Sequence, residues 1–189
     1  MRKQEARKTY NQKRTEISYG DKLKWDDLIL INFQTIETPF LGTVFSFYPM
    51  EERNEVNAFL ITDFLHFRNP SLQICYPKMA VNEPNMEAVA CKADTVFEAN
   101  AINILEPLEN EIIAPEDIDL VLVPMLVCDT KGNRVGYGKG YYDRYLSRCK
   151  PSCIKVGLSY FEPIDRVEDA DEFDVALNFC ITPQKAYVF

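Results

Sequence analysis

The sequence is poor in the residues that several common kinds of active site require. It contains one histidine, one tryptophan and seven glycines in 189 residues. A single histidine excludes a histidine-rich metal site and disfavours a Ser-His-Asp triad. That residue, His66, ends an apolar helical pattern, where we expect a structural role.

The sequence also lacks paired cysteine motifs and long apolar runs. Its six cysteines form no Cys-x-x-Cys pair, and no apolar run reaches the length of a membrane span. No signal peptide is recognisable at the N-terminus. We therefore expect mostly buried, reduced thiols in a cytoplasmic protein.

The sequence has fewer basic residues than acidic ones, 21 against 29. The net charge is −8 and 47% of the residues are apolar. This composition favours one globular domain spanning residues 1–189 and argues against nucleic acid or an anionic membrane as the main partner. We expect a monomer, although composition does not determine the oligomeric state. Cations nevertheless gather at the N-terminus, around Lys3 and Arg7, and in the segment 131–144. Two cationic clusters in an acidic protein predict that an anion binds between them.

The few glycines are concentrated in one loop. Gly136, Gly138 and Gly140 occupy three of five consecutive positions. Glycine permits positive φ and lets backbone N–H groups approach a ligand closely. The loop follows the apolar run 118–127, which is typical of a buried parallel strand, and precedes a predicted helix that begins at Tyr141. A helix N-terminus after such a loop suits phosphate, although the spacing is not that of a Walker motif.

Predicted strands and helices alternate along the chain. The expected helices are residues 2–16, a helix from Ser18, a helix capped by Asn54 with Glu55 in its first turn, and 141–149; the expected strands are 42–48, 72–79 (ended by Pro77), 118–127 and 153–159, with antiparallel strands within 86–98 and a turn at Glu106-Pro107. This alternation predicts an α/β fold: a mostly parallel open sheet with helices on both faces, in a Rossmann-like three-layer arrangement.

One long string is more specific than the glycine loop alone. The segment Gly132-Asn-Arg-Val-Gly-Tyr-Gly-Lys-Gly-Tyr-Tyr-Asp-Arg-Tyr-Leu146, after a strand that ends Val-Pro-Met-Leu-Val-Cys-Asp129, closely resembles the signature of the 5-formyltetrahydrofolate cyclo-ligase family, also called methenyltetrahydrofolate synthetase. Lys3-Gln-Glu-Ala-Arg7 resembles the Lys-x-x-x-Arg pair of that family. The resemblance is firm to about Ser159 and looser after it, where Phe173 stands at a position that is commonly histidine.

This resemblance implies an enzyme that uses ATP to convert 5-formyltetrahydrofolate into 5,10-methenyltetrahydrofolate, with ADP and phosphate as the other products. It implies that the formyl oxygen attacks the γ-phosphate, that folate nitrogen 10 then closes the ring, and that phosphate leaves. ATP is the implied co-substrate and Mg²⁺ the implied cofactor. Such chemistry needs positioning and cations around the transferring phosphoryl group, and no protein nucleophile.

The resemblance also implies a set of site residues. The residues implied for ATP are Lys3, Arg7, Arg134, Val135, Gly136, Tyr137, Gly138, Lys139, Gly140, Tyr141 and Tyr142. The residues implied for the folate are Arg7, Met50, Glu55, Tyr137, Gly138, Lys139, Gly140 and Tyr141. Asp143 and Asp174 are the implied Mg²⁺ ligands, and carboxylate oxygens suit that ion.

Structural interpretations are open for several of these residues. The N-terminal helix could be merely solvated, and Glu55 could only complement a helix dipole. Asp143 could pair with Arg144 or Arg148 on its own helix, and Asp174 could cap a strand.

Two other functions are also open. One is a non-catalytic nucleotide- or folate-binding module of the same fold. Its only support is the altered sequence of the C-terminal tail, which we define as Glu162 to Asp174. The other is a sugar-phosphate isomerase or an acyl-CoA-type enzyme on a related scaffold. Neither accounts for the glycine loop and Glu55 occurring together.

Overall fold

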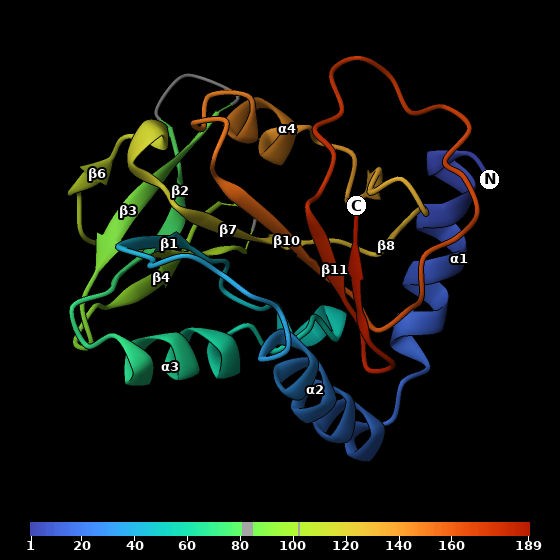
Figure 1. Cartoon of the computed structure of the whole chain (residues 1–189), viewed down its shortest axis with the longest axis horizontal. Helices are drawn as coiled ribbons and strands as arrows, with labels where there is room; N and C mark the ends of the chain where they lie inside the picture. Colours follow the sequence, from blue (N-terminus) through green and yellow to red (C-terminus); the bar gives the residue numbers. More distant parts are fainter. Residues whose placement is uncertain (81–84, 102) are drawn as a thin grey trace.

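A computed structural model of the chain describes residues 1–80, 85–101 and 103–189, and its centre is an eight-stranded sheet (Figure 1). The strands are β1 Thr43–Phe45, β2 Gln73–Met79, β3 Met86–Cys91, β4 Phe97–Ala99, β5 Leu105–Pro107, β6 Ile112–Ile113, β7 Leu120–Pro124, β8 Val127–Cys128, β9 Arg134–Val135, β10 Ile154–Leu158, β11 Phe179–Ile181 and β12 Ala186–Val188. The helices are α1 Lys3–Thr15, α2 Tyr19–Phe33, α3 Phe59–Arg68 and α4 Tyr141–Leu146, with short 3₁₀ turns at Glu51–Arg53 and Pro115–Asp117.

The middle of the sheet is parallel and its margins are antiparallel. The strand order is β12-β11-β10-β7-β1-β2-β3-β6. The five strands from β11 to β2 are mutually parallel, whereas the β11–β12, β2–β3 and β3–β6 pairs are antiparallel. The hairpins β4–β5 and β8–β9 form two small separate sheets. The predicted α/β fold with a mostly parallel open sheet is therefore confirmed.

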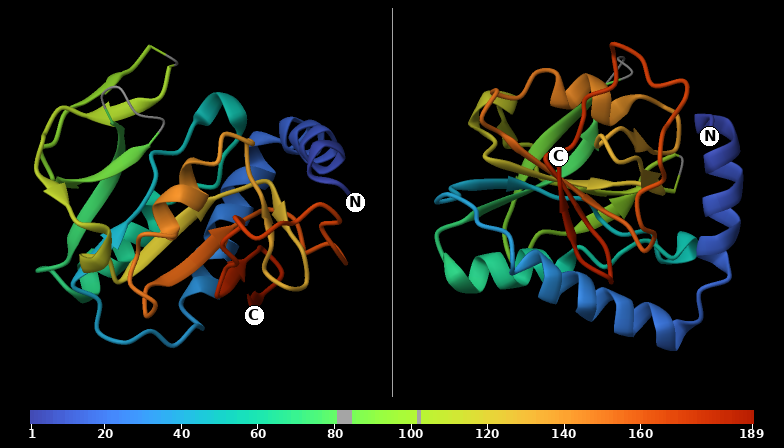
Figure 2. Two further views of the ribbon diagram at one scale, coloured as in Figure 1. Left: turned by 90° about the horizontal axis from the view of Figure 1, so that it is seen from above. Right: turned by 45° about the vertical axis from the view of Figure 1, so that its right-hand side comes forward.

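The central strand β7 is buried on both faces. Its side chains alternate, so Leu120 and Leu122 enter the core beneath α2 and α3, whereas Val121 and Val123 enter the core beneath α4. All four are fully buried. Figures 1 and 2 show α2 and α3 on one side of the sheet and α4 on the other, which confirms the three layers. This two-sided burial explains the apolar residues of β7. The single strand predicted over 118–127 was too long, because β7 ends at Pro124 and Val127 pairs with Val135 in the separate β8–β9 sheet.

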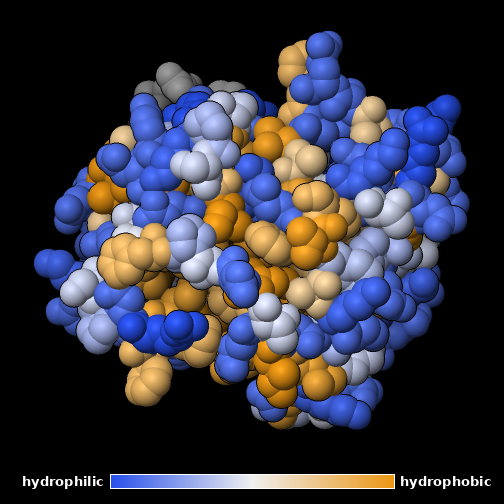
Figure 3. Space-filling model, viewed as in Figure 1, coloured by the Kyte–Doolittle hydropathy of each residue, from blue (hydrophilic) through white to orange (hydrophobic). Residues whose placement is uncertain are grey.

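The edges of the sheet are short. The edge strand β12 has three residues and β6 has two. Val188 of the edge strand β12 is 72% exposed. Figure 3 shows that apolar side chains also reach the surface in the middle of one face of the molecule. Short edge strands limit pairing with another chain. No helix in the described ranges is both long and apolar enough to cross a membrane.

Helix α1 lies beside the layers rather than within them (Figure 2). Its buried residues Ala6 and Tyr10 pack on Leu126, Val127 and Val135 around the β8–β9 hairpin. The helix is therefore docked, and the interpretation of a merely solvated terminal helix is wrong. Helix α2 begins as predicted, because the Ser18 hydroxyl accepts a hydrogen bond from its first turn.

The third helix starts later than the sequence suggested. Helix α3 begins at Phe59, whose N–H donates to the Asn57 side chain, so the prediction that Asn54 caps a helix carrying Glu55 was wrong. Asn54 instead ends the preceding 3₁₀ turn with a φ of 49°, a left-handed conformation that asparagine tolerates. Its side-chain amide donates to the carbonyl of Arg14 at the end of α1.

Two further local predictions were wrong. Strand β2 continues through Pro77, which pairs with Ala88. The pairing of β2 with β1 ends at Cys75, before the proline. Pro77 therefore does not need an N–H group to bond to β1. Glu106-Pro107 belongs to β5 rather than to a turn, and the Glu106 carboxylate accepts a hydrogen bond of 3.0 Å from the N–H of Met79. The β4–β5 hairpin is thereby tied to the end of β2.

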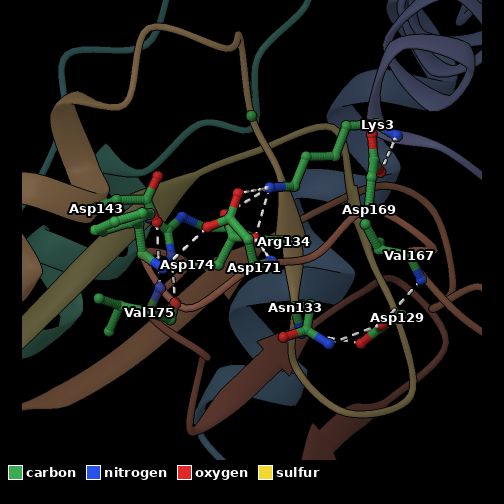
Figure 4. Close-up of polar contacts among 12 residues, drawn as sticks. Lys3, Asp129, Asn133, Arg134, Asp143, Val167, Asp169, Asp171, Asp174 and Val175 are labelled. Carbon is green, nitrogen blue, oxygen red and sulfur yellow. Dashed lines mark hydrogen bonds and ion pairs between the residues drawn. The ribbon is translucent and has the colours of Figure 1, made fainter.

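A buried carboxylate joins the β8–β9 hairpin to the C-terminal tail (Figure 4). Asp129 is fully buried and accepts from the N–H groups of Lys131, Asn133 and Val167, each at 2.9 Å, and from the Asn133 amide. Burial by itself would raise the pKa of Asp129. Hydrogen bonds from Asn133, Val167 and Lys131 outweigh this effect and hold the pKa below its usual value.

We predict that Asp129→Asn lowers the free energy of unfolding by about 2–4 kcal/mol at neutral pH, because an amide cannot accept all four hydrogen bonds. A depressed folded-state pKa stabilises the protein above the unfolded pKa, and this stability is lost as the pH falls through the folded value. Urea denaturation at neutral and acidic pH should therefore show the gap between parent and variant closing in acid. The exposed Asp165→Asn is the matched control; equal losses in both variants would contradict the assignment.

Candidate active site

A cavity of about 1200 Å³ opens where the strand order of the sheet reverses. The chain passes from β1 to β2 on one side and from β7 to β10 on the other, so the reversal falls between β1 and β7. Ligands of open α/β sheets bind beyond the carboxyl ends of the strands at such a point. Phe47 and Tyr48 after β1, Pro124 at the end of β7 and Met79 at the end of β2 line the cavity.

One wall of the cavity is the glycine loop with Arg7 of α1 lying over it. Gly138 and Gly140 have φ values of 86° and 70°, in the left-handed region that glycine permits, whereas Gly136 does not have positive φ. A Cβ on Gly138 would lie 2.9 Å from the Arg7 guanidinium carbon, so only glycine allows this approach. Arg7 Nε donates to the carbonyl of Gly136 at 2.9 Å. The structure thus brings the N-terminal cation and the glycine loop together.

The second N-terminal cation, Lys3, lies at the cavity paired with the C-terminal tail (Figure 4). Its Nζ is 2.7 Å and 2.5 Å from the two carboxylate oxygens of Asp174. Its backbone N–H donates to Asp169 at 2.7 Å, which satisfies one free donor at the start of α1. Asp174 also accepts from the N–H of Asp171 at 2.8 Å. Asp174 therefore does more than cap a strand: it holds Lys3 at the cavity.

Arg134 is buried behind the loop in a second ion pair (Figure 4). Its guanidinium donates to Asp143 at 2.5 Å and to the carbonyl of Val175. Burial lowers the pKa of Arg134, and the charge of Asp143 opposes this shift. Asp143 pairs with Arg134 rather than with Arg144 or Arg148, as the alternative interpretation held. Arg144 donates to the carbonyl of Lys139, and Arg148 donates to the carbonyl of Met86 and pairs with Glu87.

Asp143 and Asp174 are suited to a metal ion only in a limited sense. Both line the cavity, yet each already contacts a cation of the protein. Within residues 1–80, 85–101 and 103–189 no group of three or more histidine, cysteine or acidic side chains is arranged to hold a metal. Two carboxylates fit Mg²⁺ when phosphate oxygens and water complete its shell. They do not form a complete metal site by themselves.

Glu55 lies in the cavity wall next to Tyr137 of the glycine loop, as a buried hydrogen-bond acceptor. The side chain is 3% exposed, and its Oε2 accepts from the N–H of Met50 at 2.8 Å. Its Oε1 accepts from the hydroxyl of Tyr137. Burial raises the pKa of Glu55, while Tyr137, Met50, Arg14 and Arg53 oppose the rise in that order. Since Glu55 precedes α3, it does not merely complement a helix dipole.

Arg14 is a residue of this wall that the sequence analysis missed. Its guanidinium donates to the Tyr137 hydroxyl at 2.7 Å, and the side chain is only 4% exposed. A signal was present in the spacing, because Lys3, Arg7, Tyr10 and Arg14 follow at i, i+4, i+7 and i+11 and so share one face of α1. The family resemblance covers only Lys3 and Arg7 of this face, and charged residues near a terminus usually face solvent.

The remaining predicted site residues lie at different depths. Lys139 is exposed at the rim, and Tyr141 lines the cavity half-buried. Tyr142 lines it too, and its buried hydroxyl has no hydrogen-bond partner in the described part of the chain. Val135 packs beneath α1 and is fully buried, away from the cavity. His66 is exposed on α3 and does not line the cavity.

The fold and site define an α/β protein in which a glycine-rich cationic loop and a buried carboxylate acceptor line one cavity. Residues 2–183 match the 5-formyltetrahydrofolate cyclo-ligase family. The 5-formyltetrahydrofolate cyclo-ligases of Mycoplasma genitalium and Mycoplasma pneumoniae are both 30% identical, covering 94% and 97% of this chain and 97% and 100% of those proteins.

Solved structures agree with this match. The 5,10-methenyltetrahydrofolate synthetase of Aquifex aeolicus has a TM-score of 0.81 at 27% identity, covering 100% of this chain and 93% of that one. The Mycoplasma pneumoniae synthetase has a TM-score of 0.73 at 26% identity, covering 96% and 98%. The chain belongs to the 5-formyltetrahydrofolate cyclo-ligase family.

We predict that Gly138→Ala lowers the free energy of unfolding by about 1–2 kcal/mol, because alanine is strained at positive φ and its Cβ would displace Arg7. Gly136→Ala is the matched control, since a Cβ there meets nothing within 4 Å and φ is not positive. Thermal unfolding measures both variants. If Gly136→Ala were the more harmful of the two, the described packing of Arg7 on the loop would be wrong.

Proposed function

We propose that the chain catalyses the ATP-dependent closure of 5-formyltetrahydrofolate to 5,10-methenyltetrahydrofolate, with release of ADP and phosphate. Family membership over nearly the whole chain supports this. The observation that carries the proposal is that the cationic glycine loop and the buried acceptor Glu55 face one cavity large enough for two substrates. That the enzyme works as a cytoplasmic monomer is a prediction from the sequence alone.

The phosphate end of the site is the loop with its cations. Arg7, Lys3 and Lys139 supply positive charge at the cavity, and the left-handed Gly138 and Gly140 allow the backbone to approach a phosphate. Arg134 is committed to Asp143 and Val175, so we assign it to shaping the loop as well as to the charge of the site. Tyr141 and Tyr142 border the same end.

Asp143 and Asp174 would hold Mg²⁺ together with the phosphates of ATP. When bound, the ion supplies positive charge against the charge that develops on the transferring phosphoryl group. Asp174 now contacts Lys3 at 2.5 Å, so the same carboxylate keeps Lys3 beside the place where the phosphates bind.

The folate end of the site is the wall that contains Glu55. Its two oxygens each accept one hydrogen bond from the protein and retain further acceptor capacity. An ionised carboxylate can therefore accept two N–H donors from the amino-pyrimidinone edge of a pterin. Met50, whose backbone fixes Glu55, contributes an apolar side chain to the same pocket.

The reaction then needs the formyl oxygen in line with the γ-phosphate. The oxygen bonds to phosphorus as the bond to ADP breaks, and nitrogen 10 closes on the formyl carbon, losing its proton, as phosphate departs with the formyl oxygen. In this scheme the chain supplies no nucleophile. It orients the folate through Glu55 and the phosphates through Arg7 and the loop, which is the kind of catalysis that positioning provides.

The direct test is to incubate the purified protein with 5-formyltetrahydrofolate and Mg-ATP and to follow the absorbance of the methenyl product. Turnover that requires both substrates supports the proposal. Binding of both ligands without turnover would instead identify a non-catalytic module.

We predict that Glu55→Gln raises the Kd for 5-formyltetrahydrofolate by about 10- to 100-fold, because an amide turns one acceptor into a donor that faces the pterin N–H groups. ATP affinity should stay within about two-fold, since the cations Lys3 and Arg7 are held by Asp174 and Gly136 rather than by Glu55. Titration calorimetry with each ligand measures both. An unchanged folate affinity in the folded variant would remove Glu55 from the folate site.

We predict that Lys139→Met raises the KM for ATP and lowers kcat, together by about 30- to 1000-fold in kcat/KM, because it removes a charge from the phosphate loop. Lys139 gives a cleaner test than Arg134, whose removal would leave Asp143 without its cation. Lys131→Met is the matched control, as an exposed lysine that does not line the cavity. Steady-state kinetics in which the two variants behave alike would contradict the assignment.

A further inference from the structure

Arg14 occupies an unusual position for an arginine at the end of a surface helix. Its side chain is 4% exposed, and it lies in the protein wall behind Tyr137. Its Nε is buried without a hydrogen-bond partner among the described residues. It forms no direct ion pair with the described carboxylates. Burying a guanidinium this way is costly, so its one strong side-chain contact, with Tyr137, needs a physical account.

The direction of the hydrogen bonds in this wall is determined by donor chemistry. A guanidinium can only donate, so the Tyr137 oxygen accepts from Arg14 at 2.7 Å. The single proton of that hydroxyl is then available only to Glu55, whose Oε1 accepts it. The order Arg14 to Tyr137 to Glu55 leaves Tyr137 as a donor toward the carboxylate. The hydrogen bond from Tyr137 favours the ionised form of Glu55, although burial outweighs it and leaves the pKa of Glu55 raised.

Further contacts hold Arg14, Tyr137 and Glu55 in place. The Asn54 amide donates to the carbonyl of Arg14 at 3.1 Å, so the end of α1 is tied to the residue preceding Glu55. The Met50 N–H fixes the second oxygen of Glu55. Arg53 lies over the Tyr137 ring, 4.8 Å from its centroid, and Arg14 lies 5.5 Å from it.

We propose that Arg14 is a positioning residue for the substrate: acting through the Tyr137 hydroxyl, it holds Glu55 in one orientation as an ionised acceptor for a paired N–H edge such as that of a pterin. This inference rests on the proposed function, because it assumes that Glu55 receives the folate. Arg14 itself touches no ligand in this arrangement. A carboxylate oriented before binding loses less freedom when the ligand arrives, which favours tight and selective recognition.

The charges around Glu55 determine the sign of a pH effect. Arg14 from α1 and Arg53 from the 3₁₀ turn favour the ionised form, as does the hydrogen bond from Tyr137 of the loop. Burial raises the pKa values of Tyr142 of α4 and Tyr160 after β10, and both are close enough to Glu55 for its charge to raise them further. The Tyr160 hydroxyl donates to the backbone carbonyl of Glu55 and to Asp26. Removing Arg14 therefore raises the pKa of Glu55 further.

The consequence for binding follows from this sign. If the ionised carboxylate receives the folate, affinity is lost as the pH falls through the pKa of Glu55. A variant in which that pKa is higher loses affinity at a higher pH. We call the loss of folate affinity at low pH the acid limb. A residue that only stabilised the fold would not change the pH of this acid limb.

The test is titration calorimetry of 5-formyltetrahydrofolate binding, from mildly acidic to mildly alkaline pH, with the full chain and the variants Arg14→Met, Arg14→Lys and Tyr137→Phe. We expect Arg14→Met to raise the folate Kd about 10-fold at neutral pH and to move the acid limb upward. Arg14→Lys should recover part of the affinity, because it keeps the charge. Binding of ATP to Arg14→Met should stay within about two-fold of the parent value.

Tyr137→Phe removes only the hydroxyl and guards against a folding defect in the arginine variants. It should raise the folate Kd to a similar degree, and adding Arg14→Met to it should produce little further loss, because both changes break the same chain of hydrogen bonds. Lys8→Met removes an exposed cation of α1 and should leave the folate Kd unchanged.

The outcomes separate this inference from the proposed function. If the parent binds no folate, or Glu55→Gln binds it normally, the proposed function fails. Suppose that the parent binds folate and Glu55→Gln does not. The positioning role of Arg14 is then overturned if Arg14→Met loses folate affinity at the same pH as the parent. It is equally overturned by fully additive losses in the double variant.

Discussion

The docking of one face of α1 against the β8–β9 hairpin is the contact on which the site depends. Ala6 and Tyr10 bury apolar surface there, and this burial offsets the cost of bringing cations against the protein. Three cations on the same face then reach three different places: Lys3 the C-terminal tail, Arg7 the glycine loop and Arg14 the wall of Glu55. A helix that looks like a solvated terminus is therefore an integral wall of the cavity.

The second constraint is that charges taken out of water need partners. Arg134 meets Asp143, Lys3 meets Asp174, and Asp129 is satisfied by four hydrogen bonds from its own hairpin and the tail. These contacts hold the tail at the cavity although its sequence departs from the family pattern. Phe173, which replaces the common histidine, is 77% exposed at the rim, while Asp174 next to it still lines the cavity.

The predictions that held and those that were wrong differ in the range of the interactions behind them. The run around β7 indicated a buried parallel strand because both faces of a central strand are covered, and the Ser18 cap depends only on its own first turn. Asn54, Pro77 and Glu106 were misplaced because their roles depend on distant segments: the end of α1, the limited pairing between β1 and β2, and the end of β2.

The sequence by itself determined the alternation of strands and helices, the loop in which glycine is needed and, through its resemblance, the family. These features follow from local spacing and residue type. Only the tertiary structure decided which charges meet: that Asp143 pairs with Arg134 rather than with its helical neighbours, and that Arg14 reaches Glu55 through Tyr137. The physical reason is that the partner of a buried charge depends on which groups lie near it in the folded chain. Residues 14, 55 and 137 become neighbours only when α1 docks.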